Sequence, residues 1–204
     1  MHQRTHEVAA NWKLVVANFQ ESHHFPRVHP GLEAHTPFAA SSSVIPDGDA
    51  WLGGTMELHG DRETVSGTGR RDGRPFLAAL EHRRRVHDAW LAPNLLTSLQ
   101  PDYLLTYRLE PVAVDRTRVV FAIDVHASAA GSAVAAGVAD LVAFWTTTND
   151  EECVIVERQQ RGLVAAPADF RCGPYAASED GLHAFEARIA AAYLALLEPT
   201  TEAG

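Results

Sequence analysis

The segment from Arg118 to His126 places its large apolar residues at alternate positions. In an extended chain, Val119, Phe121 and Ile123 would point to one side and the residues between them to the other. This pattern is typical of a strand in an antiparallel sheet with one buried face. It does not fit a helix, where apolar residues recur every three or four positions. The segment therefore requires partner strands and an apolar layer that covers one face.

Further β-prone segments precede this strand, and turns containing glycine, proline or aspartate separate them. The predicted strands are Trp51–His59, Glu63–Thr68, Arg84–Leu91, Tyr103–Leu109 and Arg118–His126. They indicate an antiparallel meander of about five or six strands. Thr36–Asp49 is rich in serine and small residues and is expected to be a long loop.

Helical patterns flank the predicted sheet. Before it, Asn11–Ser22 carries apolar residues at helical spacing, with Asn11 as a candidate N-cap, and Pro26 and Pro30 are expected to end this helix. After it, a long helix is predicted from about Val138 to Arg161, with Gly162 as its stop. A last helix is predicted from about Glu179 to Leu197, before Pro199.

This order of elements indicates an α+β fold in which helices pack on one face of a curved antiparallel sheet. Such a sheet, wrapped around a helix, encloses an apolar cavity that suits a small molecule. The candidate walls of the cavity are Phe25, Trp90, Leu96, Phe144 and Trp145.

Composition narrows the functional classes. The 204 residues suit one domain, and the net charge of -9 argues against binding to nucleic acid or to an anionic membrane. No apolar stretch reaches the roughly 20 residues of a membrane span, and the N-terminus does not resemble a secretory signal. Two cysteines are too few for a thiolate cluster, so any metal must rest on histidine and carboxylate. A cytoplasmic protein is expected.

Three histidines and a glutamate lie between Glu21 and His29. His24 and His29 both lie close to a proline-stiffened turn. Two imidazoles, with one carboxylate from elsewhere, make up the donor set that holds Fe(II) and leaves coordination positions open. Taken alone, the pair also fits ordinary surface or core histidines.

The surrounding sequence resembles a known family. The segment NWKLVVANFQESHHFPRVHPGL (residues 11–32) is similar to the start of the catalytic domain in the large subunit of Rieske-type ring-hydroxylating oxygenases. There, an N-W-K start leads into N-F-x-E-x-Y-H-x-x-x-x-H. The resemblance continues through residues 92–119 and through FWTTTNDEECVIVERQQRGL (residues 144–163), with its Q-R-G-L signature. It implies a helix-grip fold of the START and Bet v 1-like type, with residues 1–204 as a single catalytic domain.

The resemblance also implies a ligand set. His24 and His29 match the two iron-binding histidines of the family. The family's carboxylate ligand lies eight residues before the signature glutamine, Gln160, where this chain has Glu152 instead of the usual aspartate. In a helix, Glu152 would share a stripe with Trp145, Asn149, Val156 and Gln159, which supports this register. Asp150 is the reserve candidate.

Neighbouring residues receive roles in the same way. Glu21 matches the carboxylate that connects an iron histidine to a Rieske-cluster histidine of a neighbouring subunit. Asn18 is a candidate polar group near the iron. His23 stands where the family usually has tyrosine and is expected to be a packing residue. The remaining histidines, expected to be structural or at the surface, are His35, His59, His82, His87, His126 and His183.

The function implied is that of a mononuclear non-haem Fe(II) mono- or dioxygenase, which uses dioxygen to hydroxylate an aromatic or other small organic substrate. The 204 residues lack the Cys-x-His and Cys-x-x-His pairs of a Rieske domain. Electrons are therefore expected from a 2Fe-2S cluster in trans, on a Rieske-containing donor or subunit, and the family implies a homotrimer.

Two alternatives remain open at this point. One is a metal-free helix-grip module that binds an apolar small molecule. The other is a zinc hydrolase built on the same histidines, although no H-E-x-x-H spacing is present.

Overall fold

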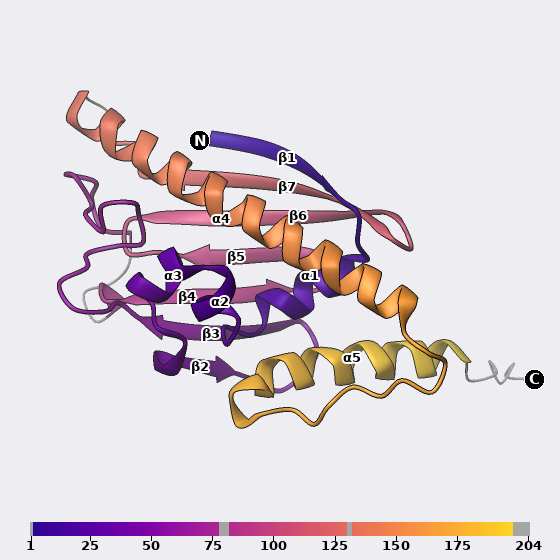
Figure 1. Ribbon diagram of the computed structural model, residues 1–204. Coiled ribbons are helices and arrows are strands. Elements are labelled where there is room, and N and C mark those ends of the chain that lie inside the picture. Colours follow the sequence, from indigo (N-terminus) through magenta and orange to yellow (C-terminus); the bar gives the residue numbers. More distant parts are fainter. Residues whose placement is uncertain (1, 78–81, 130–131, 198–204) are drawn as a thin grey trace, which may run out of the picture.

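The computed structural model describes residues 2–77, 82–129 and 132–197, in which one antiparallel sheet carries helices on one face (Figure 1). The strand order is β1-β7-β6-β5-β4-β3-β2. Strands β2 to β7 form a meander, and only β1 lies out of sequence order, on the edge beside β7. The strands are β1 (His2–Val8), β2 (Ser41–Val44), β3 (Trp51–Glu57), β4 (Arg85–Leu91), β5 (Leu95–Leu99), β6 (Tyr103–Ala113) and β7 (Arg116–Val125). The predicted α+β fold is confirmed.

The alternation that predicted β7 is visible in its burial. Val119, Phe121 and Ile123 are buried, whereas the residues between them are more exposed. This strand lies between β1 and β6 and contributes to the apolar layer under the helices.

Several predicted strand boundaries are wrong. The predicted loop Thr36–Asp49 contains a short 3-10 helix, η1 (Phe38–Ala40), and the edge strand β2. Two strands, β1 and β5, were not predicted. Glu63–Thr68, a predicted strand, instead forms bends and turns.

Buried side-chain bonds hold this last segment in its irregular path. The Thr64 hydroxyl donates to Asp102 at 2.5 Å, and Arg74 Nε donates to the same carboxylate at 2.7 Å. The Tyr103 hydroxyl also donates to the carbonyl oxygen of Val65 at 2.5 Å. Such side-chain bonds satisfy the segment without a strand partner, which propensity alone does not reveal.

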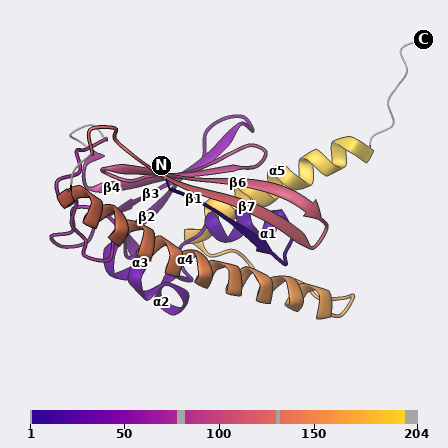
Figure 2. The same ribbon diagram turned by 90° about the horizontal axis from the view of Figure 1, so that it is seen from above.

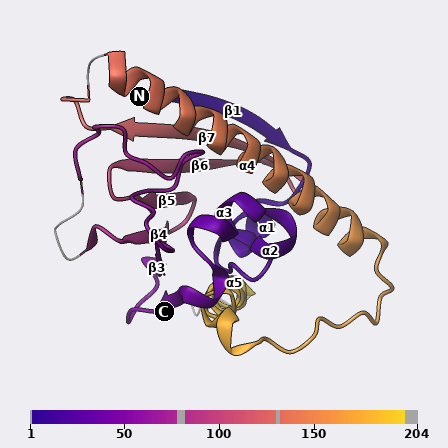
Figure 3. The same ribbon diagram turned by 60° about the vertical axis from the view of Figure 1, so that its left-hand side comes forward.

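The first helix, α1 (Trp12–Phe19), begins as predicted, because the side chain of Asn11 accepts a hydrogen bond from the backbone of Lys13 at 3.0 Å. The role predicted for the prolines is wrong. Pro26 and Pro30 begin two short helices, α2 (Phe25–Val28) and α3 (Pro30–His35), because proline fits the first turn of a helix. As Figure 3 shows, α1 to α3 lie in the space bounded by the sheet, α4 and α5.

The long helix α4 (Ser132–Ala165) runs diagonally across the sheet face (Figures 1 and 2). It is longer than predicted, and Gly162 lies inside it with no φ in the positive range. Trp145 anchors α4 to the sheet by donating from its indole nitrogen to the Tyr103 hydroxyl at 2.8 Å. No helix of the described residues is both long enough and apolar enough to cross a membrane.

The last helix, α5 (Asp180–Leu197), follows the 3-10 turn η3 (Ala177–Glu179) and lies beside β2 and β3 (Figure 1). Its bounds agree with the prediction, while Pro199 lies outside the described residues. Phe185 is buried and contacts Trp90 edge to face, at 5.0 Å between ring centroids. This contact ties the end of the chain to the sheet.

Candidate metal centre

The two histidines of interest lie at the junctions of short helices. His24 is the residue before α2, and His29 lies between α2 and α3. The breaks that the two prolines impose bring the rings together, at 5.1 Å between centroids. Phe25 contacts both rings edge to face, at 5.0 and 5.9 Å, so the pair is backed by an apolar side chain.

Glu152 joins the pair from the long helix α4. Its Oε1 lies 3.1 Å from His29 Nε2 and 3.8 Å from His24 Nε2. One ligand atom from each of the three residues lies within 4.8 Å of the others. Asp150, the reserve candidate, lies away from this group, 3.9 Å from Arg4, with 59% of its side chain exposed. The structure therefore brings Glu152, and not Asp150, to the histidines.

Each of these three side chains contacts a further polar side chain on the side away from the shared centre. Glu21 Oε1 lies 2.5 Å from His24 Nδ1, and Glu151 Oε2 lies 2.8 Å from His29 Nδ1. Asn18 donates from Nδ2 to the second carboxylate oxygen of Glu152. A carboxylate that accepts a hydrogen bond from Nδ1 favours the neutral tautomer with its proton on Nδ1 and its lone pair on Nε2, as in many histidine-metal sites.

Glu151 was not singled out from the sequence, although its signal is visible in retrospect. Adjacent residues of a helix point in directions about 100° apart. In the pair Glu151-Glu152, one carboxylate can therefore face the Nε2 atoms while the other reaches the far side of His29.

The charges in the cluster stabilise one another. Burial acts to raise the pKa of Glu152, but the neighbouring His24 and His29 outweigh it and lower that pKa to about 2. Burial acts to lower the pKa of His24, yet Glu152 and Glu21 raise it to about 9. Glu152 and then Glu151 likewise raise the pKa of His29 against burial.

The residues present fit a divalent metal. Both Nε2 atoms are buried without a hydrogen bond, although each points toward the carboxylate of Glu152. The three ligand atoms are close enough for one bound metal ion to become the shared partner of all three side chains. Two imidazoles and one carboxylate form the donor set of non-haem Fe(II) oxygenases, and a similar set serves catalytic zinc.

We expect Glu21→Gln and Glu151→Gln each to weaken metal binding by about 10- to 100-fold, because each removes the charge that orients a ligand histidine. The check is a competitive titration of Co(II) or Fe(II) into the metal-free proteins. Asp150→Asn, which removes an exposed carboxylate from the same helix, should bind metal as the wild type does. Equal affinity in all variants would contradict an orienting role.

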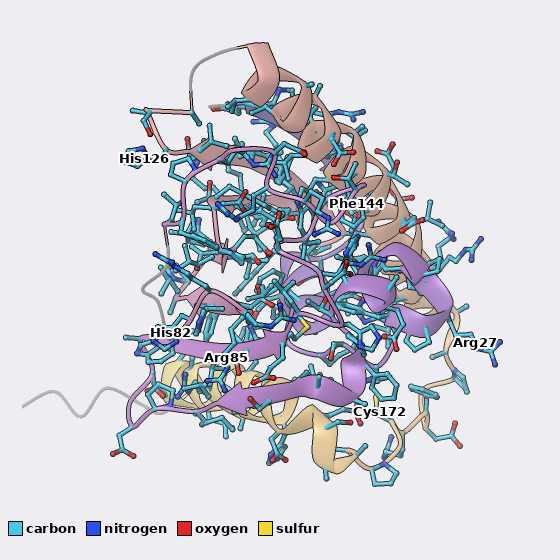
Figure 4. All side chains as sticks on the ribbon, turned by 90° about the vertical axis from the view of Figure 1, so that its left-hand side faces the viewer. Arg27, His82, Arg85, His126, Phe144 and Cys172 are labelled. Atoms are coloured by element: carbon cyan, nitrogen blue, oxygen red, sulfur yellow. The ribbon has the colours of Figure 1, made fainter. Side chains whose placement is uncertain are left out.

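Other histidines have different surroundings. His23, expected to be a packing residue, is 47% exposed, and its Nδ1 lies 2.7 Å from Glu21 Oε2. His35 is buried against Phe144, at 5.5 Å between ring centroids. Figure 4 shows His82 and His126 on the side of the molecule away from α2, whose Arg27 points outward at the opposite edge.

A cavity of about 150 Å³ adjoins the candidate centre, between the sheet, α1 and α4. Phe25 and Trp145 line it as predicted. Trp90 and Leu96 do not, because they pack instead in the core cluster around Phe185. Phe144, labelled in Figure 4, also lies outside the lining, and its ring contacts His35 and Trp145 edge to face. The principal lining residues from the sheet are Gly54, Met56, Asp88, Ser98, Gln100, Tyr107 and Phe121.

One lining residue, Asp88 on β4, was not singled out from the sequence. Burial raises its pKa to about 6, although a hydrogen bond from Ser98 acts in the opposite direction. The signal was present, because a single carboxylate lies between Val86 and Trp90 on the inward-facing side of the strand. A carboxylate at such a position is costly unless something pairs with it.

The raised pKa of Asp88 predicts a pH-dependent stability. Between the ordinary pKa of 3.8 and about 6, the folded state holds a proton that the unfolded state has released. The free energy of unfolding therefore falls as pH rises through this window, by up to about 3 kcal/mol. In Asp88→Asn this fall should be absent, so the variant should be more stable than the wild type at pH 7.5 and similar at pH 4. Urea unfolding at the two pH values tests this, and a variant less stable at both would contradict it.

The sequence of the chain matches a known protein family. A sequence profile of the family described as ring hydroxylating alpha subunit (catalytic domain) matches residues 1–195. The chain belongs to this family. The family resemblance seen in the sequence is thereby confirmed, over nearly the whole chain.

Solved structures of a quaternary ammonium Rieske monooxygenase and of dicamba monooxygenase share the fold. The quaternary ammonium Rieske monooxygenase CntA, in complex with an inhibitor, superimposes with a TM-score of 0.69 at 18% identity, over 95% of this chain and 49% of that chain. Dicamba monooxygenase bound to 3,6-dichlorosalicylic acid gives 0.67 at 14% identity, over 97% and 60%. The chain thus spans 49% and 60% of the lengths of these two relatives.

Proposed function

We propose that this chain is the iron-binding oxygenase domain of a Rieske-type enzyme, which uses dioxygen to hydroxylate an aromatic or other small organic substrate. One observation carries the proposal. His24 Nε2, His29 Nε2 and the carboxylate of Glu152 converge beside a cavity, and both nitrogens are buried without a hydrogen bond. Bound Fe(II) would supply the redox chemistry that activates dioxygen, at coordination positions that the three protein ligands leave open.

The protein's own residues prepare this site. Glu21 and Glu151 accept from the Nδ1 atoms of the two imidazoles and so orient both Nε2 atoms toward the metal position, where a bound metal would replace the Nε2 protons. Asn18 fixes the second oxygen of Glu152 and so limits the carboxylate to one orientation. With these partners in place, the ligand atoms need little rearrangement to bind.

The cavity supports a small organic substrate. Its size is comparable with cavities that hold a single aromatic ring. Phe25, Tyr107, Phe121 and Trp145 provide apolar surface next to Glu152. Such walls hold a substrate by burial of its apolar body and exclude water from the reacting position.

Glu21 supports electron delivery from a Rieske centre on another chain. One of its oxygens contacts His24, and the other contacts His23. Glu21 itself is 7% exposed, whereas His23 is 47% exposed. A Rieske-containing donor or subunit at this surface would therefore meet a continuous path His23-Glu21-His24. Inter-subunit electron transfer is described for a quaternary ammonium Rieske monooxygenase, and a homotrimer would bring a neighbouring subunit to this surface.

Anaerobic titration of the chelator-treated protein with Fe(II) tests the proposal. We expect about one iron to bind per chain, because the described residues contain one such donor set. The Asp150→Asn variant should bind the same amount. Folded protein that takes up no metal would contradict the proposal and favour a ligand-binding module. Zinc that resists removal, together with no iron uptake, would contradict it in favour of a hydrolytic centre.

A further inference from the structure

Asp88 lacks a cationic partner. In the described parts of the chain, no lysine, arginine or histidine forms an ion pair with its carboxylate, which faces the Ser98 hydroxyl on β5. Its register partner on β3 is Gly54, so no side chain covers Asp88 from that strand. Both residues line the cavity next to the candidate metal centre. The carboxylate is therefore open to a ligand in the cavity.

Gln100 provides a second, independent observation. This residue is only 1% exposed and lines the same cavity, and its Oε1 has no hydrogen-bond partner. Its Nε2 donates to Ser98 Oγ at 2.9 Å. Ser98 is the register partner of Asp88 on β5, and a hydroxyl that donates to this carboxylate accepts from Gln100, which leaves the amide oxygen free. Asp88 and Gln100 thus both present acceptor oxygens to the cavity.

The charged lining residues of the cavity are carboxylates, and His24 and His29, which lie outside the lining, pair with Glu21 and Glu152 but not with Asp88. The lining carboxylates are Glu21, Asp88 and Glu152, and no lysine or arginine occurs among the described lining residues. His6, also in the lining, is kept neutral near pH 7 because burial, and then Arg4, lower its pKa. Such a cavity favours a cation and disfavours a carboxylate ligand.

Tyr107 connects this polar patch to the metal centre. Burial first, and then the charges of Glu152 and Asp88, raise the pKa of Tyr107. Its phenol therefore lies near both carboxylates. Tyr107 also contacts both apolar clusters of the core. A ligand held at Asp88 would lie with its apolar body along Tyr107, toward Glu152.

The geometry points to a binding subsite for a protonated primary or secondary amine, formed by the carboxylate of Asp88 and the free amide oxygen of Gln100. The amine would donate one N–H to each acceptor and neutralise the buried charge. The apolar remainder of the ligand would occupy the aromatic part of the cavity. That this ligand is the substrate rests on the proposed oxygenase function, whereas the subsite itself does not.

Binding of matched probes to the metal-free protein tests the subsite. We expect benzylamine, protonated at pH 7.5, to bind at least about tenfold more tightly than benzyl alcohol, which has the same shape without the charge. Trimethylbenzylammonium, a cation without an N–H, should bind more weakly than benzylamine. Isothermal titration calorimetry gives the three dissociation constants.

The Asp88→Asn variant should lose the preference for the amine over the alcohol, while Asp115→Asn, which alters an exposed turn residue, should keep it. Equal affinities in the wild type, no measurable benzylamine binding, or a preference that survives in Asp88→Asn would overturn the subsite. A preference for the trimethyl compound would do the same, because it would assign the cation to the aromatic walls. Iron uptake by the same proteins is measured separately, so failure of the subsite and failure of the oxygenase proposal are distinguishable.

Discussion

His24→Ala and His29→Ala are each expected to lose iron binding. Each variant removes one of the nitrogen ligands, and loss of a ligand should exceed the roughly 10- to 100-fold effect of losing an orienting partner. Affinity for Fe(II) should therefore fall by more than about 100-fold. Iron per chain after anaerobic loading and desalting is the measurement. Hydroxylation with a Rieske donor present should fall below detection in both variants.

The matched control is His126→Ala, which removes an exposed histidine away from α2 (Figure 4). It should retain the iron content of the wild type. Because His29 is fully buried, near-ultraviolet circular dichroism should establish that its variant keeps its packing. A folded His24→Ala or His29→Ala protein that still holds one iron per chain would contradict the assignment of ligands.

Glu152→Gln is expected to lower Fe(II) affinity by more than about 100-fold, since it removes the negative ligand but keeps the shape of the side chain. Glu152→Asp retains the charge and withdraws it by about 1 Å, a displacement that active sites tolerate poorly. It also separates the carboxylate from Asn18. We therefore expect the affinity of Glu152→Asp to lie between those of the wild type and Glu152→Gln.

Competition with a coloured chelator under anaerobic conditions gives all three affinities. Asp150→Asn serves as the control on the same helix, because its side chain points away from the centre. Loss of iron in Asp150→Asn, with wild-type binding in Glu152→Gln, would reverse the assignment of the carboxylate ligand.

The sequence predicted the fold class because large segments have unambiguous periods. Residues 118–126 alternate as a half-buried strand must, and Asn11 caps the first helix as its side chain allows. Glu63–Thr68 was predicted as a strand from its β propensity. In the structure, hydrogen bonds from Thr64 to Asp102 and from Tyr103 to Val65 hold it in an irregular path instead. Those partners are distant in sequence, so no local pattern records them.

The sequence named the three residues that the structure brings together, His24, His29 and Glu152, and missed part of their surroundings. Glu152 was preferred to Asp150 because of its position eight residues before Gln160 in the family resemblance, and the helical stripe through Trp145 supported that register. The bond from Glu151 to His29 joins residues on α4 and at the start of α3, and depends on how these helices pack. Alternation along β4 could have placed Asp88 on the inward face, but its neighbours Gly54 and Ser98 follow only from the strand register.

The central claim is that His24, His29 and Glu152 hold iron together, and anomalous diffraction tests it most directly. Crystals grown anaerobically with Fe(II) would be measured on both sides of the iron absorption edge. We expect a single anomalous difference peak for iron, enclosed by His24 Nε2, His29 Nε2 and the carboxylate of Glu152. An ordered cluster without a peak, or an iron peak bound by other residues, would contradict it.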